Sequence, residues 1–484
     1  MNTVSIFRRG RRAARADVAH VVEGQATVVG EVRREVLTAE AVPLSSVQAQ
    51  LWREQAGRPD LPMWVAHCVE LSRDETNGDA LGAGELDVAR LREASRLAAA
   101  ELGSGLLRLV TVDGTPHQVL DPTLDADPDY LDLRGEPAPR AAAEAWMRAE
   151  LDTPDPQLAR IAVLRVDDTR YLWFSRFHPT ILDGFGAVTL LARAAELYDA
   201  AVTGTQARPD RALGPAAIAD LERDYEASAR RTADAAYWSE RLAGAPAGTS
   251  LADAAQAAES GPASDPVRTG DDRYVHAERP GMAGLLVDAE RRYGTGAAAL
   301  AASALAAYLA RVTGRSDVVL DLPLPARMSA GLRYSGGALE NAVPLRLHVA
   351  AGATVAELIV DTHQALVGAV QHQRFRFAPD RASRPVGPVL RVALATRVLR
   401  LHGQQVELRE MSTSAVEDLR VELAERPDGS VRVAFTANPN RYDGAELVRH
   451  HRQFTRLFAR MLEADPSTEI GDLRIEPRVR LHVV

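Results

Sequence analysis

The stretch that decides the fold of this 484-residue chain is His178-Pro179-Thr180-Ile181-Leu182-Asp183-Gly184. Two apolar, β-prone runs precede it, at residues 158–166 and 171–177, and an Asp-Asp-Thr-Arg sequence between them predicts a hairpin turn. After it, apolar side chains recur at helical spacing over residues 188–198. Residues 178–186 are therefore predicted to form a short loop between a strand and a helix, a place where rigid elements often hold functional side chains.

A single His-x4-Asp-Gly pattern has two interpretations, a functional loop or a structural His-Asp pair that closes a loop. Five other segments make the first interpretation stronger, because they recur in a fixed order along the chain. They are LSSVQAQLW at 44–52, the Tyr-Trp helix and its Leu-Ala-Gly end at 224–244, DVVLDLPLPAR at 317–327, NAVPLR at 341–346, and a predicted Asp-Gly hairpin at 428–429 followed by a helix at 447–462.

In this order the segments resemble the condensation domains of nonribosomal peptide synthetases, over roughly residues 42–475. The loop is similar to their HHxxxDG motif, with Pro179 in place of the second, reacting histidine. Proline has no proton to give or accept, so it cannot act as a general base. Other departures are Gly103-Ser104-Gly105 for Arg-His-Glu, Phe185-Gly186 for Trp-Ser, and Asp321 for a glycine.

The resemblance implies an α+β fold of two chloramphenicol-acetyltransferase-like lobes, which form a V-shaped pseudo-dimer with a tunnel between them. The sequence mixes helix and strand patterns without regular βαβ alternation, which agrees with this class. We expect an N-terminal arm or docking segment at residues 1–41, an N-terminal lobe at 42–212 and a C-terminal lobe at 213–484. Within the first lobe, Asp87 is expected to cap a helix with Val88, Leu91, Ala94 and Leu97 on one face.

The resemblance assigns roles to six positions. They are His178, Pro179, Asp183 and Gly184 in the catalytic loop, and Arg327 and Asn341 as structural residues of the site. His178 would be mainly structural, and Asp183 would hold the loop by pairing with Arg327, although a solvated Asp and Arg remain an alternative. Gly184 would line the channel near a pantetheine arm, and Asn341 would lie near the lobe junction.

The sequence gives only weak support for another histidine as a substitute for the one that Pro179 replaces. His450-His451 lies in a helical pattern of apolar residues, and no Asp-Gly follows it at the right spacing. His67 alternates with apolar neighbours on a predicted strand, where it faces either a core or the tunnel.

Composition excludes several kinds of chemistry. The chain contains no lysine, which excludes a lysine Schiff base and a P-loop. The single cysteine, Cys68, excludes an internal disulfide and a multi-cysteine metal site, so we expect no metal and no directly bound cofactor. The net charge is −9 with dispersed arginines, and no apolar run approaches the roughly 20 residues of a membrane span. We expect a cytoplasmic protein that binds neither nucleic acid nor membrane.

Three functions follow from these observations. The first is an acyltransferase that forms an amide or ester between a donor thioester and an amine acceptor, with substrates delivered on the phosphopantetheine arms of donor and acceptor carrier proteins. The second is an inactive condensation-like domain that recruits carrier proteins, adjacent synthetase domains or a tailoring enzyme. Members of the family that recruit cytochrome P450 enzymes also keep the first histidine and lose the second. The third, ranked last, is a dehydration or cyclisation of a tethered intermediate.

Overall fold

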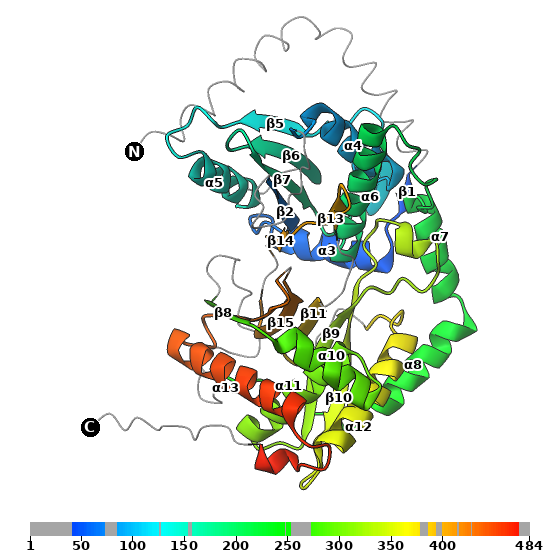
Figure 1. Ribbon diagram of the computed structural model, residues 1–484. Coiled ribbons are helices and arrows are strands. Elements are labelled where there is room, and N and C mark those ends of the chain that lie inside the picture. Colours follow the sequence, from blue (N-terminus) through cyan, green and yellow to red (C-terminus); the bar gives the residue numbers. More distant parts are fainter. Residues whose placement is uncertain are drawn as a thin grey trace, which may run out of the picture.

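The computed structural model describes residues 41–72, 85–124, 127–152, 157–246, 248–252, 273–377, 386–393, 399–413, 416–426 and 428–473. The predicted arm at 1–41 lies almost entirely outside these residues. Figure 1 shows two lobes, each with its own sheet, and helix α7 (Pro215–Glu226) running beside the junction between them. The expected fold class is confirmed, because the two lobes combine helices with separate sheets rather than one βαβ array.

The sheet of the first lobe has five strands in the order β14-β2-β7-β6-β5. Its strands are β2 (Val65–Ser72), β5 (Asp129–Asp132), β6 (Ala159–Arg165), β7 (Arg170–Phe177) and β14 (Leu408–Glu410). Helices α4 (Val88–Glu101) and α6 (Gly184–Thr203) bury one face of this sheet, and α5 (Pro139–Leu151) buries the other. The predicted hairpin is present as the antiparallel pair β6–β7, whose end leads directly into the loop at His178.

A small sheet and a helix pair complete the region above the junction. The small sheet has the strand order β1-β4-β3. Helix α3 lies next to the loop that follows β7, because Gln48 of α3 bonds to Thr180. Its elements and the two linking helices are β1 (Val42–Pro43), α3 (Ser46–Gly57), β3 (Leu107–Val112), β4 (Thr115–Leu120), α7 (Pro215–Glu226) and α8 (Ala229–Arg241).

The sheet of the second lobe has six strands in the order β10-β9-β11-β15-β16-β8. Its elements are β8 (Arg273–Arg279), β9 (Asp317–Leu324), β10 (Asn341–His348), β11 (Val389–Ala393), β15 (Leu419–Glu425), β16 (Val431–Ala437), α10 (Met282–Tyr293), α11 (Ala297–Thr313), α12 (Val355–Gln371) and α13 (Gly444–Glu463). The four helices and one face of the sheet form a single apolar core. Strand alternation leaves the other face, with Arg391 on β11 and Glu422 on β15, outside that core and directed toward the first lobe.

One segment crosses between the lobes against the predicted boundaries. Strand β14 follows β11 in the chain but pairs antiparallel with β2 of the first lobe, and β12 (Arg400–Leu401) packs beside α6. Strand β12 forms a two-stranded antiparallel ribbon with β13 (Gln404–Gln405). The assignment of all of 213–484 to the second lobe is therefore wrong for the segment that contains β12 to β14. The sequence of a three-residue strand does not indicate which sheet it will join, so this crossing could not be predicted.

Two further expectations need correction. Helix α6 begins at Gly184 rather than at residue 188, so the loop before it is shorter than predicted and Asp183 becomes the N-cap. In α4 the cap Asp87 is confirmed, but Leu97 is 39% exposed, and the buried stripe runs through Leu91, Ala94 and Ala98. Repeated steps of three residues fall about 60° behind per step on a helix of 3.6 residues per turn, so Leu97 rotates off the buried face.

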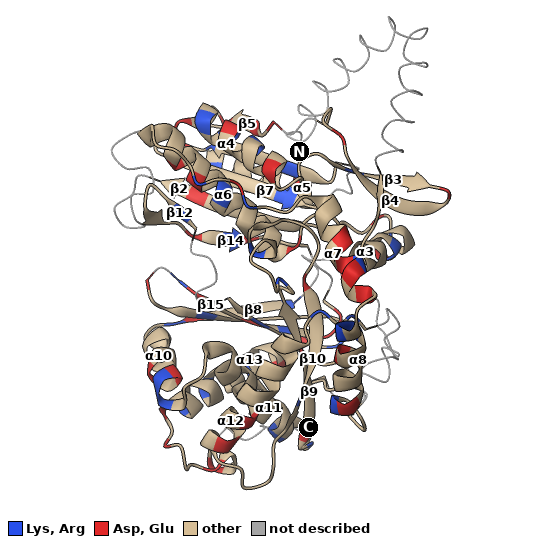
Figure 2. Ribbon diagram, turned by 90° about the vertical axis from the view of Figure 1, so that its right-hand side faces the viewer, with Lys and Arg blue, Asp and Glu red and all other residues tan. Residues whose placement is uncertain are grey.

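Among the described residues, no single helix is both long and apolar enough to span a membrane. Helices α10 and α11 pass that test only as a pair, bent by 97°, and both contribute to the core of the second lobe. In the described part of the chain, acidic and basic residues are interspersed along the ribbons of both lobes (Figure 2).

Candidate functional site

The catalytic-loop candidates lie where strand β7 ends and helix α6 begins, at the junction of the lobes. Asp183 caps the helix: its Oδ1 accepts a hydrogen bond of 2.8 Å from the backbone N–H of Gly186. Such a cap satisfies one of the N–H groups that a first helical turn leaves without a partner. The cap therefore fixes the direction in which the loop leaves the sheet.

The carboxylate of Asp183 also binds the second lobe. Arg327 donates to it from Nη1 at 2.9 Å and from Nη2 at 2.8 Å, and the backbone N–H groups of Leu339 and Glu340 donate at 2.8 Å each. Both side chains of this ion pair are nearly fully buried, and the Arg327 guanidinium also lies 4.5 Å from the centre of the Phe185 ring. The pairing expected between Asp183 and Arg327 is present, and it joins the two lobes.

His178 is held in the wall of the loop. Its Nδ1 accepts a hydrogen bond from the backbone N–H of Thr180 at 3.2 Å, and its Nε2 lies 3.3 Å from Gln55 Oε1. Burial lowers the pKa of His178 to about 4, so the ring is neutral near pH 7. With Nδ1 occupied as an acceptor, the proton is on Nε2, which points at Gln55. The ring thus acts here as a spacer between the loop and α3.

Pro179 follows His178 and is partly exposed. Its ring offers no donor or acceptor, so the position expected to carry the reacting histidine contributes shape alone. Gly184 is also partly exposed, and a Cβ built on it would lie 3.6 Å from Arg391 Nη2 and 3.9 Å from Glu340 Oε2, which is ordinary contact. The backbone of Gly184 therefore borders charged groups of the second lobe.

Asn341 lies at the start of β10 and holds a neighbouring turn. Its Nδ2 donates to the carbonyl oxygens of Gln373 at 2.8 Å and Phe375 at 2.7 Å. Arg376, from the same turn, donates to the carbonyl oxygens of Leu339 and Glu340. Asn341 thus supports, from behind, the backbone that binds Asp183.

Two glutamines of α3 position the loop and were not predicted as site residues. Gln48, in a capping box with Ser45, donates from Nε2 to the carbonyl oxygen of Thr180 at 3.0 Å. Gln55 contacts His178, as described above. Gln48 was detectable, because it stands three residues after Ser45 in the 44–52 segment, which is the spacing of a capping box.

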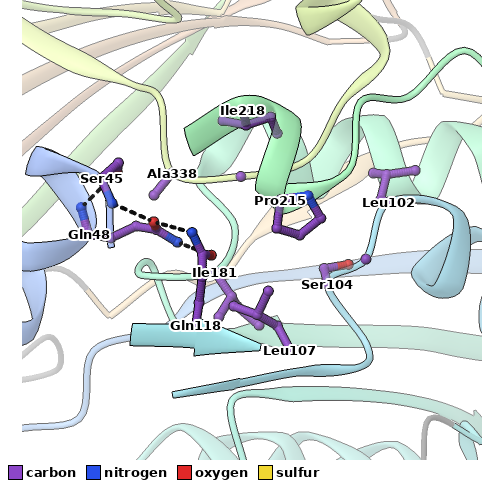
Figure 3. Close-up of a pocket in the computed structure, with 12 residues that line it drawn as sticks. Ser45, Gln48, Leu102, Ser104, Leu107, Gln118, Ile181, Pro215, Ile218 and Ala338 are labelled. Atoms are coloured by element: carbon purple, nitrogen blue, oxygen red, sulfur yellow. Dashed lines mark hydrogen bonds between the residues drawn. The ribbon is translucent and has the colours of Figure 1, made fainter. Parts of the chain in front are cut away.

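A hollow next to the loop carries no acid or base. Figure 3 shows the residues that line this hollow, among them Ile181, Pro215 and Ser104. Gln48 and Gln118, which are joined by a hydrogen bond, also line it. Ser104 and its neighbour Gly103 stand where the resemblance places a histidine and an arginine, so small side chains leave this space open. None of the lining residues is titratable, and the hollow supplies no group for proton transfer.

Comparison with known proteins places this geometry in a family. The sequence profile of the Condensation domain family matches residues 63–479. This chain belongs to the Condensation domain family. It is 30% identical over 454 residues to isonitrile lipopeptide synthase of Streptomyces coeruleorubidus, and 27% identical over 453 residues to enterobactin synthase component F of Escherichia coli O157:H7; each alignment covers 90% of the chain. It covers 29% and 33% of those two proteins, so the chain spans about a third of their length.

Solved condensation domains have the same fold. The first condensation domain of the calcium-dependent antibiotic synthetase, in complex with a substrate analogue, superposes with a TM-score of 0.76 at 27% identity, covering 90% of this chain and all of that one. A starter condensation domain of rhizomide synthetase in complex with C8-CoA gives 0.77 at 26% identity, covering 91% and 99%. Within this condensation domain, three of the ordered motifs, at 44–52, 317–327 and 341–346, meet at or beside the catalytic loop.

The other histidines lie in different surroundings. His450 and His451 are buried in α13 of the second lobe, where they contact Tyr308 and the carbonyl oxygen of Val433. They serve that core, as the helical pattern predicted. His67 is 4% exposed on β2, opposite Glu410 in the β2–β14 register, and its Nδ1 has no hydrogen-bond partner among the described residues. Burial lowers the pKa of its ring to about 4, and two charged groups, Glu410 and Arg391, act on it in opposite directions.

Proposed function

We propose that this condensation domain forms an amide, or an ester, between a carrier-bound acyl or aminoacyl thioester and an acceptor, without the usual motif histidine. The thioester is already activated, and holding two reactants in line supplies a large part of such a rate. The observation that supports the proposal most is the intact clamp on Asp183, in which five hydrogen bonds from both lobes fix the loop around Pro179. The domain keeps the framework that positions substrates and lacks one proton-transfer group.

Substrates would reach the domain on phosphopantetheine arms of donor and acceptor carrier proteins in the cytoplasm. The relatives support this part of the proposal, since one is named a dimodular nonribosomal peptide synthase of Bacillus subtilis, 27% identical over 432 residues and 86% of this chain. Neighbouring synthetase domains or a tailoring enzyme are further candidate partners. The chain itself would need no bound cofactor for acyl transfer between thioester and amine.

A second candidate is a non-catalytic domain that recruits or scaffolds carrier proteins or tailoring enzymes. Pro179 favours it, because replacement of the motif histidine removes the only side chain that the family pattern assigns to the reacting groups. The two candidates differ in whether an amide forms, not in whether carriers bind.

Intact-mass spectrometry on loaded donor and acceptor carrier proteins separates the two. We expect the native chain to transfer the acyl group, which appears as a mass shift of the acceptor carrier. Pro179→His should form the same product, faster. Product with Pro179→His but none with the native chain would refute catalysis and support the scaffold. Asp183→Ala, which loses the clamp, is the control that should give no product in either background.

A further inference from the structure

The space in front of Gly184, at the first turn of α6, is bordered by two polar groups of the second lobe that the proposed function does not use. A Cβ built on Gly184 would lie 3.6 Å from Arg391 Nη2 and 3.9 Å from Glu340 Oε2. Because glycine has no side chain, a ligand can approach its backbone closely here. We call the surface formed by Gly184, Arg391 and Glu340 the Gly184 surface.

Other contacts hold the two polar groups in place. Arg391 donates from Nη1 to Glu410 Oε1 at 2.7 Å, which joins β11 of the second sheet to β14 of the first. The backbone N–H of Glu340 donates to Asp183 at 2.8 Å, and its carbonyl oxygen accepts from Arg376 Nη1 at 3.2 Å. The backbone of Glu340 is thus part of the clamp, and one terminal nitrogen of Arg391 anchors the guanidinium.

The atoms that face Gly184 keep their own capacity for hydrogen bonds. Within the described ranges, neither Nη2 of Arg391 nor the carboxylate of Glu340 has a hydrogen-bond partner, and the two form no ion pair with each other. The Arg391 side chain keeps 27% of its surface exposed, and Gly184 and Glu340 are partly exposed. One donor and one acceptor therefore border the same accessible space, with a gap between them.

The charges around the Gly184 surface balance, so that neither an ammonium nor a carboxylate group gains net attraction there. Four carboxylates, those of Asp183, Glu340, Glu410 and Glu422, act together with four guanidinium groups, those of Arg327, Arg391, Arg420 and Arg432. A neutral group that carries both an acceptor and a donor matches the two free atoms better than any ion.

A secondary amide in its trans form has this arrangement. The amide is planar, and its C=O and N–H point in opposite directions, so it can accept from a donor on one side and donate to an acceptor on the other. Burial raises the pKa of the Glu340 carboxyl, but the charged and the neutral form both present an acceptor oxygen. The match to an amide therefore holds in either form.

We propose that the Gly184 surface binds a secondary amide of the tethered substrate, with Arg391 Nη2 donating to its carbonyl oxygen and Glu340 accepting from its N–H. The amides of a pantetheine arm and those of an acyl or peptidyl group attached to it share this chemistry. Either contact would fix how far the thioester reaches along the loop that contains Pro179. This inference rests on the proposed function, which supplies the tethered substrate.

Binding is tested without turnover by calorimetry on the full chain. The probes are donor carrier proteins with four different arms. Each arm is pantetheine or an alkyl chain of equal length, and it ends in an N-acetylglycyl or a butyryl group, joined through CH₂ in place of sulfur so that no transfer occurs. A hydrogen bond to a charged group is worth about tenfold or more in affinity, so removal of the bound amide should weaken binding by about that factor.

The four arms also separate the two sources of the amide. Weaker binding of the alkyl arms assigns the bound amide to pantetheine, and weaker binding of the butyryl arms assigns it to the acyl group. Equal affinity for all four arms, or no binding of any, would overturn the amide site.

Three variants tie the preference to the Gly184 surface. Glu340→Leu removes the acceptor, Arg391→Lys keeps a cation beside Glu410 but loses the second arm of the fork, and Gly184→Ala fills the space without a contact under 3.6 Å. Each should reduce the tenfold preference to about threefold or less. Glu340→Gln, which keeps an acceptor oxygen, should retain most of it, and so should the matched control Glu425→Leu on the exposed end of β15. An unchanged preference in Glu340→Leu and Gly184→Ala would refute the proposal.

The amide site and the proposed function fail separately. A chain that prefers the amide arms but forms no product from loaded carriers would lose the acyl-transfer function and keep the amide site. A chain that forms product and binds all four arms equally would keep the function and lose the amide site.

Discussion

Removal of the Asp183 carboxylate is expected to destabilise this chain far more than the loss of an ordinary helix cap. Asp183→Ala removes the cap of α6, which is worth about 1 kcal/mol, and leaves Arg327 buried without its counter-ion, which costs about 3–5 kcal/mol. Together these terms amount to roughly 4–6 kcal/mol. That is a large part of the 5–15 kcal/mol by which typical domains are stable.

Equilibrium unfolding in urea, followed by tryptophan fluorescence, measures this free energy. The matched control is Asp443→Ala, since Asp443 caps α13 through one hydrogen bond of 2.7 Å from Glu446 N–H and no arginine pairs with its carboxylate among the described residues. We expect the control to lose about 1 kcal/mol. In Asp183→Ala/Arg327→Met, part of the loss should return, because the unpaired charge is gone. Equal losses in Asp183→Ala and Asp443→Ala would refute the account of the clamp.

Two further predictions follow from the loop. Since burial lowers the pKa of His178 from 6.5 to about 4 on folding, its contribution to stability is complete above pH 6.5 and is lost as pH drops toward 4. Over this window the unfolding free energy of the native chain should fall by up to about 3 kcal/mol more than that of His178→Gln, and the partly exposed control His117→Gln should follow the native chain. Gly186→Ala would place a Cβ 2.8 Å from Leu182 Cδ1 and should lower the thermal midpoint, whereas Gly184→Ala, with no contact under 3.6 Å, should leave it nearly unchanged; a similar shift for both in differential scanning calorimetry would contradict this packing.

Local patterns predicted the elements around the site well. The two runs before His178 form β6 and β7, the helix predicted after Asp87 is α4, and the helix predicted at 447–462 lies within α13. Each of these strands and helices buries one side of its own segment, and the spacing of apolar residues in the sequence shows that side directly. The start of α6 was missed because Gly184 and Gly186 are poor helix formers, although the Asp183 cap and the packing of the helix outweigh that preference.

The site itself was only partly predictable. The pairing of Asp183 with Arg327 followed from the resemblance, because both residues belong to ordered motifs. The meeting of the charged residues Glu340, Arg391 and Glu410 with His67 between the lobes did not, since these residues come from separate segments of the chain. Two local signals were present. His67 alternates with apolar neighbours, which left open whether it faces a core or the tunnel, and Arg420 and Glu422 interrupt the buried strand β15. Alternation shows that these residues share a face, but not that this face meets His67 and Glu410 of the other sheet.

The most direct test of the central claim is the single-turnover rate constant for acyl transfer between loaded carrier proteins, with the native chain and with Pro179→Ala. If positioning by the clamped loop supplies the catalysis, the native chain should exceed the uncatalysed reaction by at least about 100-fold, and Pro179→Ala should stay within about threefold of it, since proline contributes no proton transfer. A native rate constant equal to that of the uncatalysed reaction would contradict the claim that this chain forms the bond.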